Sequence, residues 1–196
     1  MYDFLVTDRS TLTGVVPVND HREPDEELLL AETPDGAGVA LYIDPAVLAR
    51  LEASDPLGAL TEENLADYCT ALDGVSHFLY SIWRLECDAP VSLLELECQA
   101  EVDKYAATVF LLGWQQGGSY PTQVHARLFD RVEFDARLEP EQFDRYRTAH
   151  RSAANFCRRL ERRFVSRGTA KVEPLVRELR KFYRLGSSAK LHYAIS

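Results

Sequence analysis

Residues 28–43 read LLLAETPDGAGVALYI, and this stretch shows that the fold is not purely helical. Two almost continuous apolar runs flank Thr33–Gly38, a segment rich in turn-forming residues. Pro34 fixes its own φ angle and Gly36 tolerates positive φ, so both residues suit a chain reversal. The stretch therefore predicts a β-hairpin that is covered on at least one face. Upstream of it, Asp3–Val6 predicts a short strand.

Downstream of the hairpin, apolar residues recur at helical spacing. Asp44 followed by Pro45 is typical of a helix start, and Ser92 begins a capping-box pattern. Pro140 and Pro174 lie near the starts of two later helices. The predicted helices cover roughly residues 45–53, 61–84, 92–114, 122–131, 139–166 and 173–185.

The predicted fold class is therefore α+β and predominantly α, with an N-terminal β-hairpin packed on a bundle of five or six helices. Helices joined by short loops tend to pack antiparallel. A chain of 196 residues can bury one good core without disulfides. We expect a single domain over 1–196, with a strand and hairpin segment at 1–43, the helical bundle at 44–185 and a tail at 186–196.

The composition is that of a globular protein, with 46% hydrophobic and 27% charged residues. It excludes a disordered tail, a collagen-like fibre and a disulfide scaffold. No signal peptide and no bilayer-spanning apolar stretch is visible. The four cysteines form no C-x-x-C pair, and Cys69, Cys98 and Cys157 fit apolar helical positions. Reduced thiols and a cytoplasmic location are the consistent expectation.

Charge is segregated along the chain. Residues 1–100 carry 4 basic and 20 acidic residues, a net charge of −16, whereas residues 145–196 carry 14 basic and 3 acidic residues, a net charge of +11. On the last two predicted helices the basic residues lie opposite the apolar ones, so both helices are amphipathic with cationic outer faces. The candidate binding residues on these faces are Arg147, Arg151, Arg158, Arg162, Arg177, Arg180, Lys181 and Arg184.

Several interpretations of the cationic faces stay open. A solvated surface that the acidic half partly neutralises is the simplest. An acidic protein partner comes next, since guanidinium groups grip carboxylates bidentately. A nucleic acid is a less favoured alternative, because the chain has a net charge of −9 and carries no nucleic-acid-binding signature. No membrane partner is expected, and a helix that lies on a membrane surface is the least favoured interpretation. The oligomeric state is not predicted.

Two polar stripes are the candidates for chemistry. Asp73, His77, Tyr80 and Arg84 follow one helix at i, i+4, i+7 and i+11, and Glu97, Glu101 and Lys104 follow the next. If the stripes faced each other, His77, Glu97 and Glu101 could bind a transition metal or transfer protons. Ordinary helix charges are the favoured interpretation, with Glu101 and Lys104 as an i, i+3 pair. Neither a metal site nor a cofactor is predicted.

A second, weaker candidate site comprises His125 and Arg127 near the glycine loop, and His150 lies on an apolar face as a core histidine would. The chain has no G-x-S-x-G elbow, P-loop or G-x-G-x-x-G motif. The favoured hypothesis is a non-enzymatic module that binds a macromolecule through its basic C-terminal helices. The alternatives are a metal-binding or acid–base enzyme using the His77 region, and a nucleic-acid binder.

Overall fold

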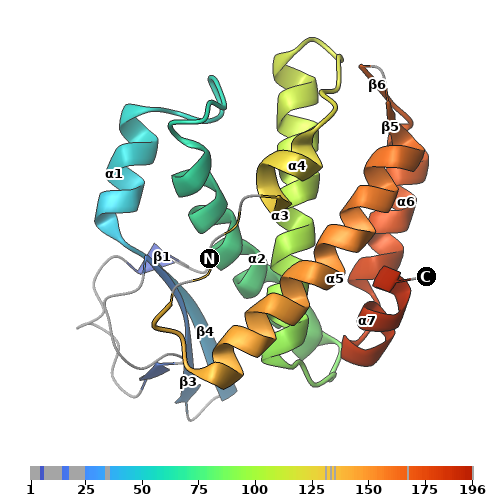
Figure 1. Ribbon diagram of the computed structural model, residues 1–196. Coiled ribbons are helices and arrows are strands. Elements are labelled where there is room, and N and C mark those ends of the chain that lie inside the picture. The colour runs from blue at the N-terminus through green and yellow to red at the C-terminus, as the bar shows by residue number, and fades with distance from the viewer. Residues whose placement is uncertain are drawn as a thin grey trace. The chain divides into compact units, whose positions relative to one another are not determined.

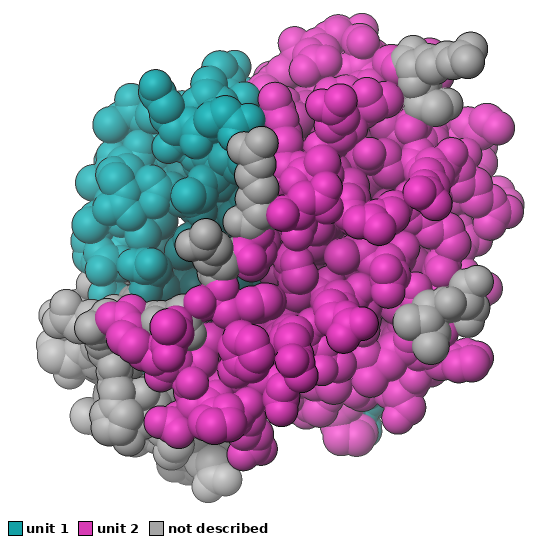
Figure 2. Space-filling model, in the orientation of Figure 1, with its two compact units in different colours: residues 1–89 teal, residues 90–196 magenta. Residues whose placement is uncertain are grey.

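A computed structural model describes residues 5–6, 15–17, 25–33, 36–130, 132, 134, 136–166 and 168–195. The chain divides into two compact units, residues 1–89 and 90–196, which Figure 2 colours separately. The first unit contains a four-stranded sheet and two helices, and the second contains the other described helices and a two-stranded hairpin.

The strands of the first unit are β1 (Leu5–Val6), β2 (Val15–Pro17), β3 (Glu26–Thr33) and β4 (Gly36–Ile43), and its helices are α1 (Pro45–Ala53) and α2 (Leu65–Glu86). The second unit comprises α3 (Leu93–Gln115), α4 (Val124–Phe129), α5 (Pro140–Phe164), β5 (Val165–Ser166), β6 (Thr169–Ala170), α6 (Val172–Tyr183) and α7 (Ser187–Ile195). The predicted class, α+β and predominantly α with an N-terminal hairpin, is confirmed.

The predicted hairpin consists of β3 and β4, which pair antiparallel with Leu28 opposite Leu41. Strand β1 extends the sheet in parallel with β4, and β2 pairs with the other edge of the hairpin, which gives the order β1-β4-β3-β2. Leu5–Val6, the second half of the predicted strand, is β1. Asp3–Phe4 and the predicted turn residues Pro34–Asp35 lie outside the described part of the chain.

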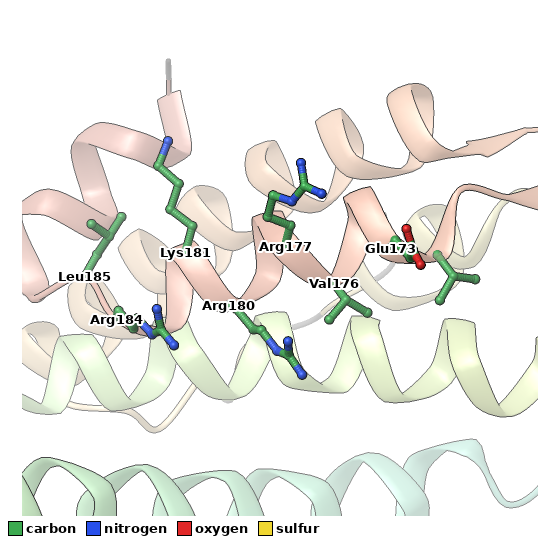
Figure 3. Close-up of a pocket in the computed structure, with 8 residues that line it drawn as sticks. Glu173, Val176, Arg177, Arg180, Lys181, Arg184 and Leu185 are labelled. Carbon is green, nitrogen blue, oxygen red and sulfur yellow. The ribbon is translucent and has the colours of Figure 1, made fainter.

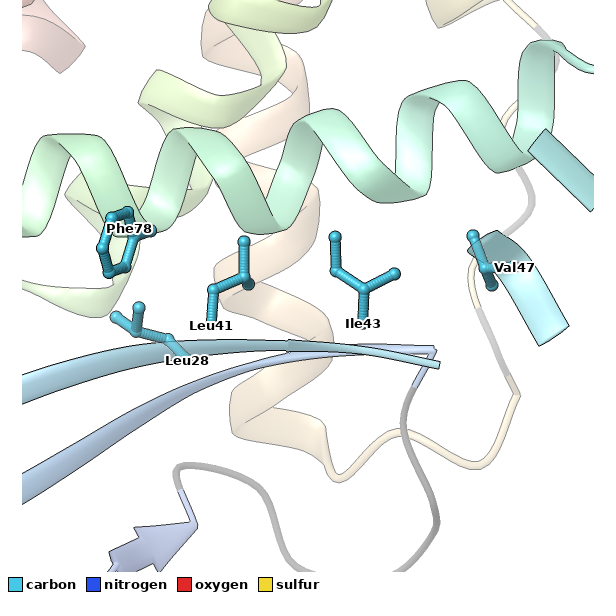
Figure 4. Close-up of a cluster of buried hydrophobic side chains, with 5 residues drawn as sticks. All are labelled: Leu28, Leu41, Ile43, Val47 and Phe78. Atoms are coloured by element: carbon cyan, nitrogen blue, oxygen red, sulfur yellow. The ribbon is translucent and has the colours of Figure 1, made fainter. Parts of the chain in front are cut away.

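The core of the first unit forms where α2 crosses the hairpin. Figure 4 shows Leu28, Leu41 and Ile43 rising from the strands toward α2. Phe78 of α2 and Val47 of α1 complete this buried cluster, and a fully buried aliphatic or aromatic side chain contributes about 1.5–3 kcal/mol. Gly74 allows the close approach, because a Cβ atom there would lie 2.7 Å from the Leu41 Cδ1 atom.

In the second unit the long helix α5 runs obliquely across α3 (Figure 1). Both helices start where their local signals predict. The Ser92 hydroxyl accepts a hydrogen bond from the backbone of Glu95, and Glu139 with Gln142 forms a capping box ahead of Pro140. The inner face of α5 buries an apolar stripe against its neighbours, namely Ala149, Ala153, Phe156, Cys157, Leu160 and Phe164.

The C-terminal residues differ from the prediction. Residues 186–196 were expected to be a tail, but Ser187–Ile195 forms α7, so the described residues contain seven helices where five or six were predicted. Tertiary contacts explain the difference. Helix α7 is nine residues long, and a helix of this length has only marginal stability unless it packs against other elements. It contacts α5 and α3. The prediction of one domain over 1–196 stays a prediction.

The cysteines differ in their exposure to solvent. Cys98 and Cys157 are buried, Cys69 is half-buried, Cys87 is exposed, and all four are free thiols. Burial raises the pKa of the Cys157 thiol well above its usual range, so this thiol is inert. None of the described helices combines the length and apolarity that crossing a membrane would need.

Candidate functional site

Helix α6 has a buried side and a cationic side. Leu175 and Phe182 are fully buried, and the Phe182 ring stacks on Phe156 of α5 with 4.3 Å between ring centroids. The opposite side carries the four predicted cations of this helix, Arg177, Arg180, Lys181 and Arg184, and all four are exposed. The amphipathic pattern predicted from the sequence is thus present in the structure.

These four cations line a single hollow of about 710 Å³ (Figure 3). The lining residues form two i, i+4 rows that run along α6 and just past its end at Tyr183, one with Val172, Val176, Arg180 and Arg184 and the other with Glu173, Arg177, Lys181 and Leu185. We call these eight residues the α6 face. In Figure 3, Arg177 and Lys181 extend from one side of the helix ribbon and Arg180 and Arg184 from the other. The hollow is therefore the groove between two ridges of one helix.

The cations of the α6 face are not paired with any carboxylate that the structure describes. Across the described residues, no salt bridge engages Arg177, Arg180, Lys181 or Arg184. The Lys181 ammonium lies 4.5 Å from the centroid of the Tyr193 ring, which fixes the side chain without neutralising it. Glu173 is the one carboxylate among the lining residues.

The predicted cations of α5 are only partly uncompensated. A guanidinium nitrogen of Arg147 lies 2.7 Å from Asp144, and one of Arg158 lies 3.6 Å from Asp130. Arg151 and Arg162 are exposed and form no salt bridge with any residue that the structure describes. The eight predicted binding residues therefore separate into two compensated arginines and six cations that form no salt bridge with any described residue.

The candidate acid–base residues are held by neighbours within their own units. His77 and Asp73 belong to α2, and the His77 Nδ1 atom lies 3.9 Å from Glu26 of β3. Glu97 and Glu101 belong to α3, and Glu97 lies 3.8 Å from the Arg145 guanidinium of α5. Their grouping into one site stays a prediction. Within the described ranges, no group of three His, Cys, Asp or Glu residues could hold a metal ion.

The histidine beside Glu101 in the second unit is His150. Lys104 donates a hydrogen bond of 2.8 Å to Glu101 as predicted, and the His150 Nδ1 atom lies 3.5 Å from the other carboxylate oxygen. Burial alone would raise the pKa of Glu101, but Lys104 and His150 outweigh burial and lower the pKa to about 2. The His150 Nε2 atom donates to the Phe129 carbonyl at 3.2 Å. Both ring nitrogens face oxygens of the fold, so His150 links α5 to Glu101 of α3 and to Phe129 of α4.

His125 of the second candidate site is also engaged. Its Nε2 atom is 2.9 Å from the Ala154 carbonyl, and its backbone N–H donates to Glu161 at 2.9 Å. Burial lowers the pKa of His125, which keeps the ring neutral. Arg127 is exposed. These contacts attach α4 to α5, and they give His125 a structural role.

The sequence analysis did not anticipate Lys190 of α7. This side chain is fully buried, and its ammonium donates to the Gln99 side chain at 2.5 Å and to the Phe182 carbonyl at 2.9 Å. It therefore caps the C-terminal end of α6 from within the core. No local signal could have found it, because residues 186–196 were predicted to be a tail and the Gln99 partner lies 91 residues away in sequence.

Tyr105 lies fully buried in α3, and its hydroxyl has no hydrogen-bond partner in the described part of the chain. An unsatisfied buried hydroxyl lowers stability, so Tyr105→Phe is expected to raise the free energy of unfolding by about 1 kcal/mol. Tyr193→Phe is the matched control, because the Tyr193 hydroxyl donates to Glu178 and its loss should destabilise. Urea unfolding of both variants checks the opposite signs, and destabilisation by Tyr105→Phe would contradict the assignment.

The chain matches no protein-family model, and no characterised protein or solved structure matches it. Among the side chains of this chain, the α6 face is the most distinctive arrangement from which a function can be inferred.

Proposed function

We propose that the protein is a non-enzymatic binding module that holds an acidic surface of a protein partner against the α6 face. One observation carries the proposal: the described structure leaves Arg177, Arg180, Lys181 and Arg184 without a salt bridge while they line one hollow. The second unit as a whole supplies a favourable field, since residues 90–196 carry 18 basic and 13 acidic residues.

The composition of the α6 face supports a protein partner over a nucleic acid. Val172 and Val176 line the same hollow as the arginines, and Val172 is 39% exposed. A protein surface can cover apolar side chains and pair with guanidinium groups at once, whereas phosphate contacts would use only the charges. The net charge of −9 also weakens any general attraction to nucleic acid.

The α6 face is rigidly supported, which favours binding. Phe182 is stacked on Phe156, and Lys190 bonds the last turn of α6 to Gln99 of α3. A helix held in this way loses little conformational freedom when a partner docks, so more of the interaction energy remains as affinity.

Paired charge-removal variants test the proposal. The probe is a short fluorescein-labelled Glu-rich peptide, and its affinity is measured by fluorescence anisotropy at low and high NaCl. Arg177→Gln with Arg180→Gln is expected to weaken binding about tenfold, or roughly 1.4 kcal/mol, because each exposed charge pair contributes up to about 1 kcal/mol. Arg147→Gln with Arg158→Gln removes the same charge but should change the affinity less than about twofold, since Asp144 and Asp130 already compensate these arginines.

Two results would overturn the proposal. Equal losses in the two double variants would mean that net charge, and not the α6 face, governs binding. The partner would be a nucleic acid if transfer RNA or duplex DNA bound more tightly than the Glu-rich peptide and if Arg177→Gln with Arg180→Gln abolished that binding. High salt is expected to abolish peptide binding, because exposed charges are screened within about 10 Å at 0.1 M salt.

A further inference from the structure

We infer that the segment bound by the α6 face is an amphipathic helix, seated in the groove between the two rows of α6, with carboxylates at its cationic end and apolar side chains at its valine end. This inference rests on the proposed function and names the class of partner. It is based on the order of residues along the two rows. Net charge alone would not require apolar and cationic residues to follow one another in this order.

The two rows define a groove that suits a helix. Helices pack by setting a ridge of side chains, spaced four residues apart, into the groove between two such ridges of a neighbour. Three members of each ridge lie on α6 and the fourth follows its last residue, and no described residue from another element lines the hollow between them. Successive members lie about 6 Å apart along the axis, so the groove extends about 18 Å.

The chemistry of the groove changes along its length. The N-terminal half of the first row is apolar, with Val172 and Val176, and its C-terminal half is cationic, with Arg180 and Arg184. The second row places Glu173 and Arg177 beside the valines, and Lys181 and Leu185 beside the arginines, so the N-terminal half of the groove has no net charge and the C-terminal half carries three cations. A complementary ridge therefore carries two apolar residues followed by two carboxylates at four-residue spacing.

An extended acidic chain fits less well. Extended segments bind chiefly by adding a strand to a sheet edge, where the backbone supplies hydrogen bonds. The α6 face is built from helical side chains and offers no such edge. A bound extended chain would have only its charges to use and would leave Val176 uncovered.

Peptides of identical composition test the inference on the full chain. The row peptide is Ala-based and carries Leu, Leu, Glu and Glu at i, i+4, i+8 and i+12. The scrambled peptide distributes the same residues around the helix, and a third peptide has proline at two central positions of the row sequence. The row peptide is expected to bind at least tenfold more tightly than the other two and to gain helical circular dichroism on binding. Val176→Thr, which keeps the side-chain shape, should weaken only the row peptide.

Each outcome has a distinct meaning. Equal affinity of the row and scrambled peptides would overturn the helix inference and leave the proposed function intact, because charge alone would then suffice. Failure of all three peptides and of the Glu-rich probe to bind would overturn the proposed function itself. Sedimentation equilibrium tests for another occupant of the groove. If the chain forms a dimer that dissociates in the double variant Arg177→Gln, Arg180→Gln, the occupant is a second copy of the chain, and the inference is overturned.

Discussion

Replacement of Lys190 by alanine is expected to lower the free energy of unfolding by about 3–5 kcal/mol, the range for losing one member of a buried charged network. The side chain is fully buried, so its removal leaves a cavity lined by the Phe182 ring, which lies 4.4 Å from the ammonium. The Gln99 oxygen would also lose its donor inside the core, and the Phe182 carbonyl would keep only backbone donors such as the Leu185 N–H. Urea unfolding followed by circular dichroism measures the change.

Two controls separate the causes of this loss. Lys190→Met keeps most of the side-chain volume and removes only the donors, so about 1–3 kcal/mol should be lost. Lys171→Ala removes an exposed lysine at the start of α6, and a change within about 0.5 kcal/mol is expected. If Lys190→Ala and Lys171→Ala changed the free energy of unfolding by the same small amount, the Lys190 ammonium would not hold α6 and α7 together.

Helix starts and the hairpin could be predicted from the sequence because their signals are local. Asp44 ahead of Pro45, Ser92 and Pro140 each act within one helical turn, and the structure places helices after all three. The hairpin was recognisable for the same reason, since its two apolar runs are close in sequence. Such signals do not depend on the rest of the fold.

Helix α7 and the pairing of charges could not be predicted from local signals. Nine residues rarely form a stable helix alone, and α7 depends on Lys190 bonding to Gln99, 91 residues away in sequence. The i, i+3 pair of Glu101 and Lys104 was predicted, but the approach of His150 to Glu101 requires that α3 and α5 pack together. Helical periodicity places cations on one face, but tertiary contacts decide which of them are compensated.

Glu101→Gln is expected to destabilise the protein by about 3 kcal/mol at pH 7, since each unit of pKa difference is worth about 1.4 kcal/mol. Lys104 and His150 hold the pKa of Glu101 at about 2 in the folded protein, below the value of 4.5 expected when the chain is unfolded. A lowered pKa means that the carboxylate stabilises the fold fully above about pH 4.5 and that this stabilisation is lost as the pH falls toward 2.

The pH dependence identifies the physical origin of the loss. Urea unfolding of wild type and Glu101→Gln at pH 7, 4.5 and 2 should show a difference that is full at neutral pH and falls below about 0.5 kcal/mol at pH 2, where wild-type Glu101 is about half protonated in the folded protein. Glu173→Gln, at an exposed carboxylate of the α6 face, should show little difference at any pH. A difference for Glu101→Gln that stays constant with pH would mean that packing of the side chain, and not its charge beside Lys104 and His150, stabilises the contact between α3 and α5.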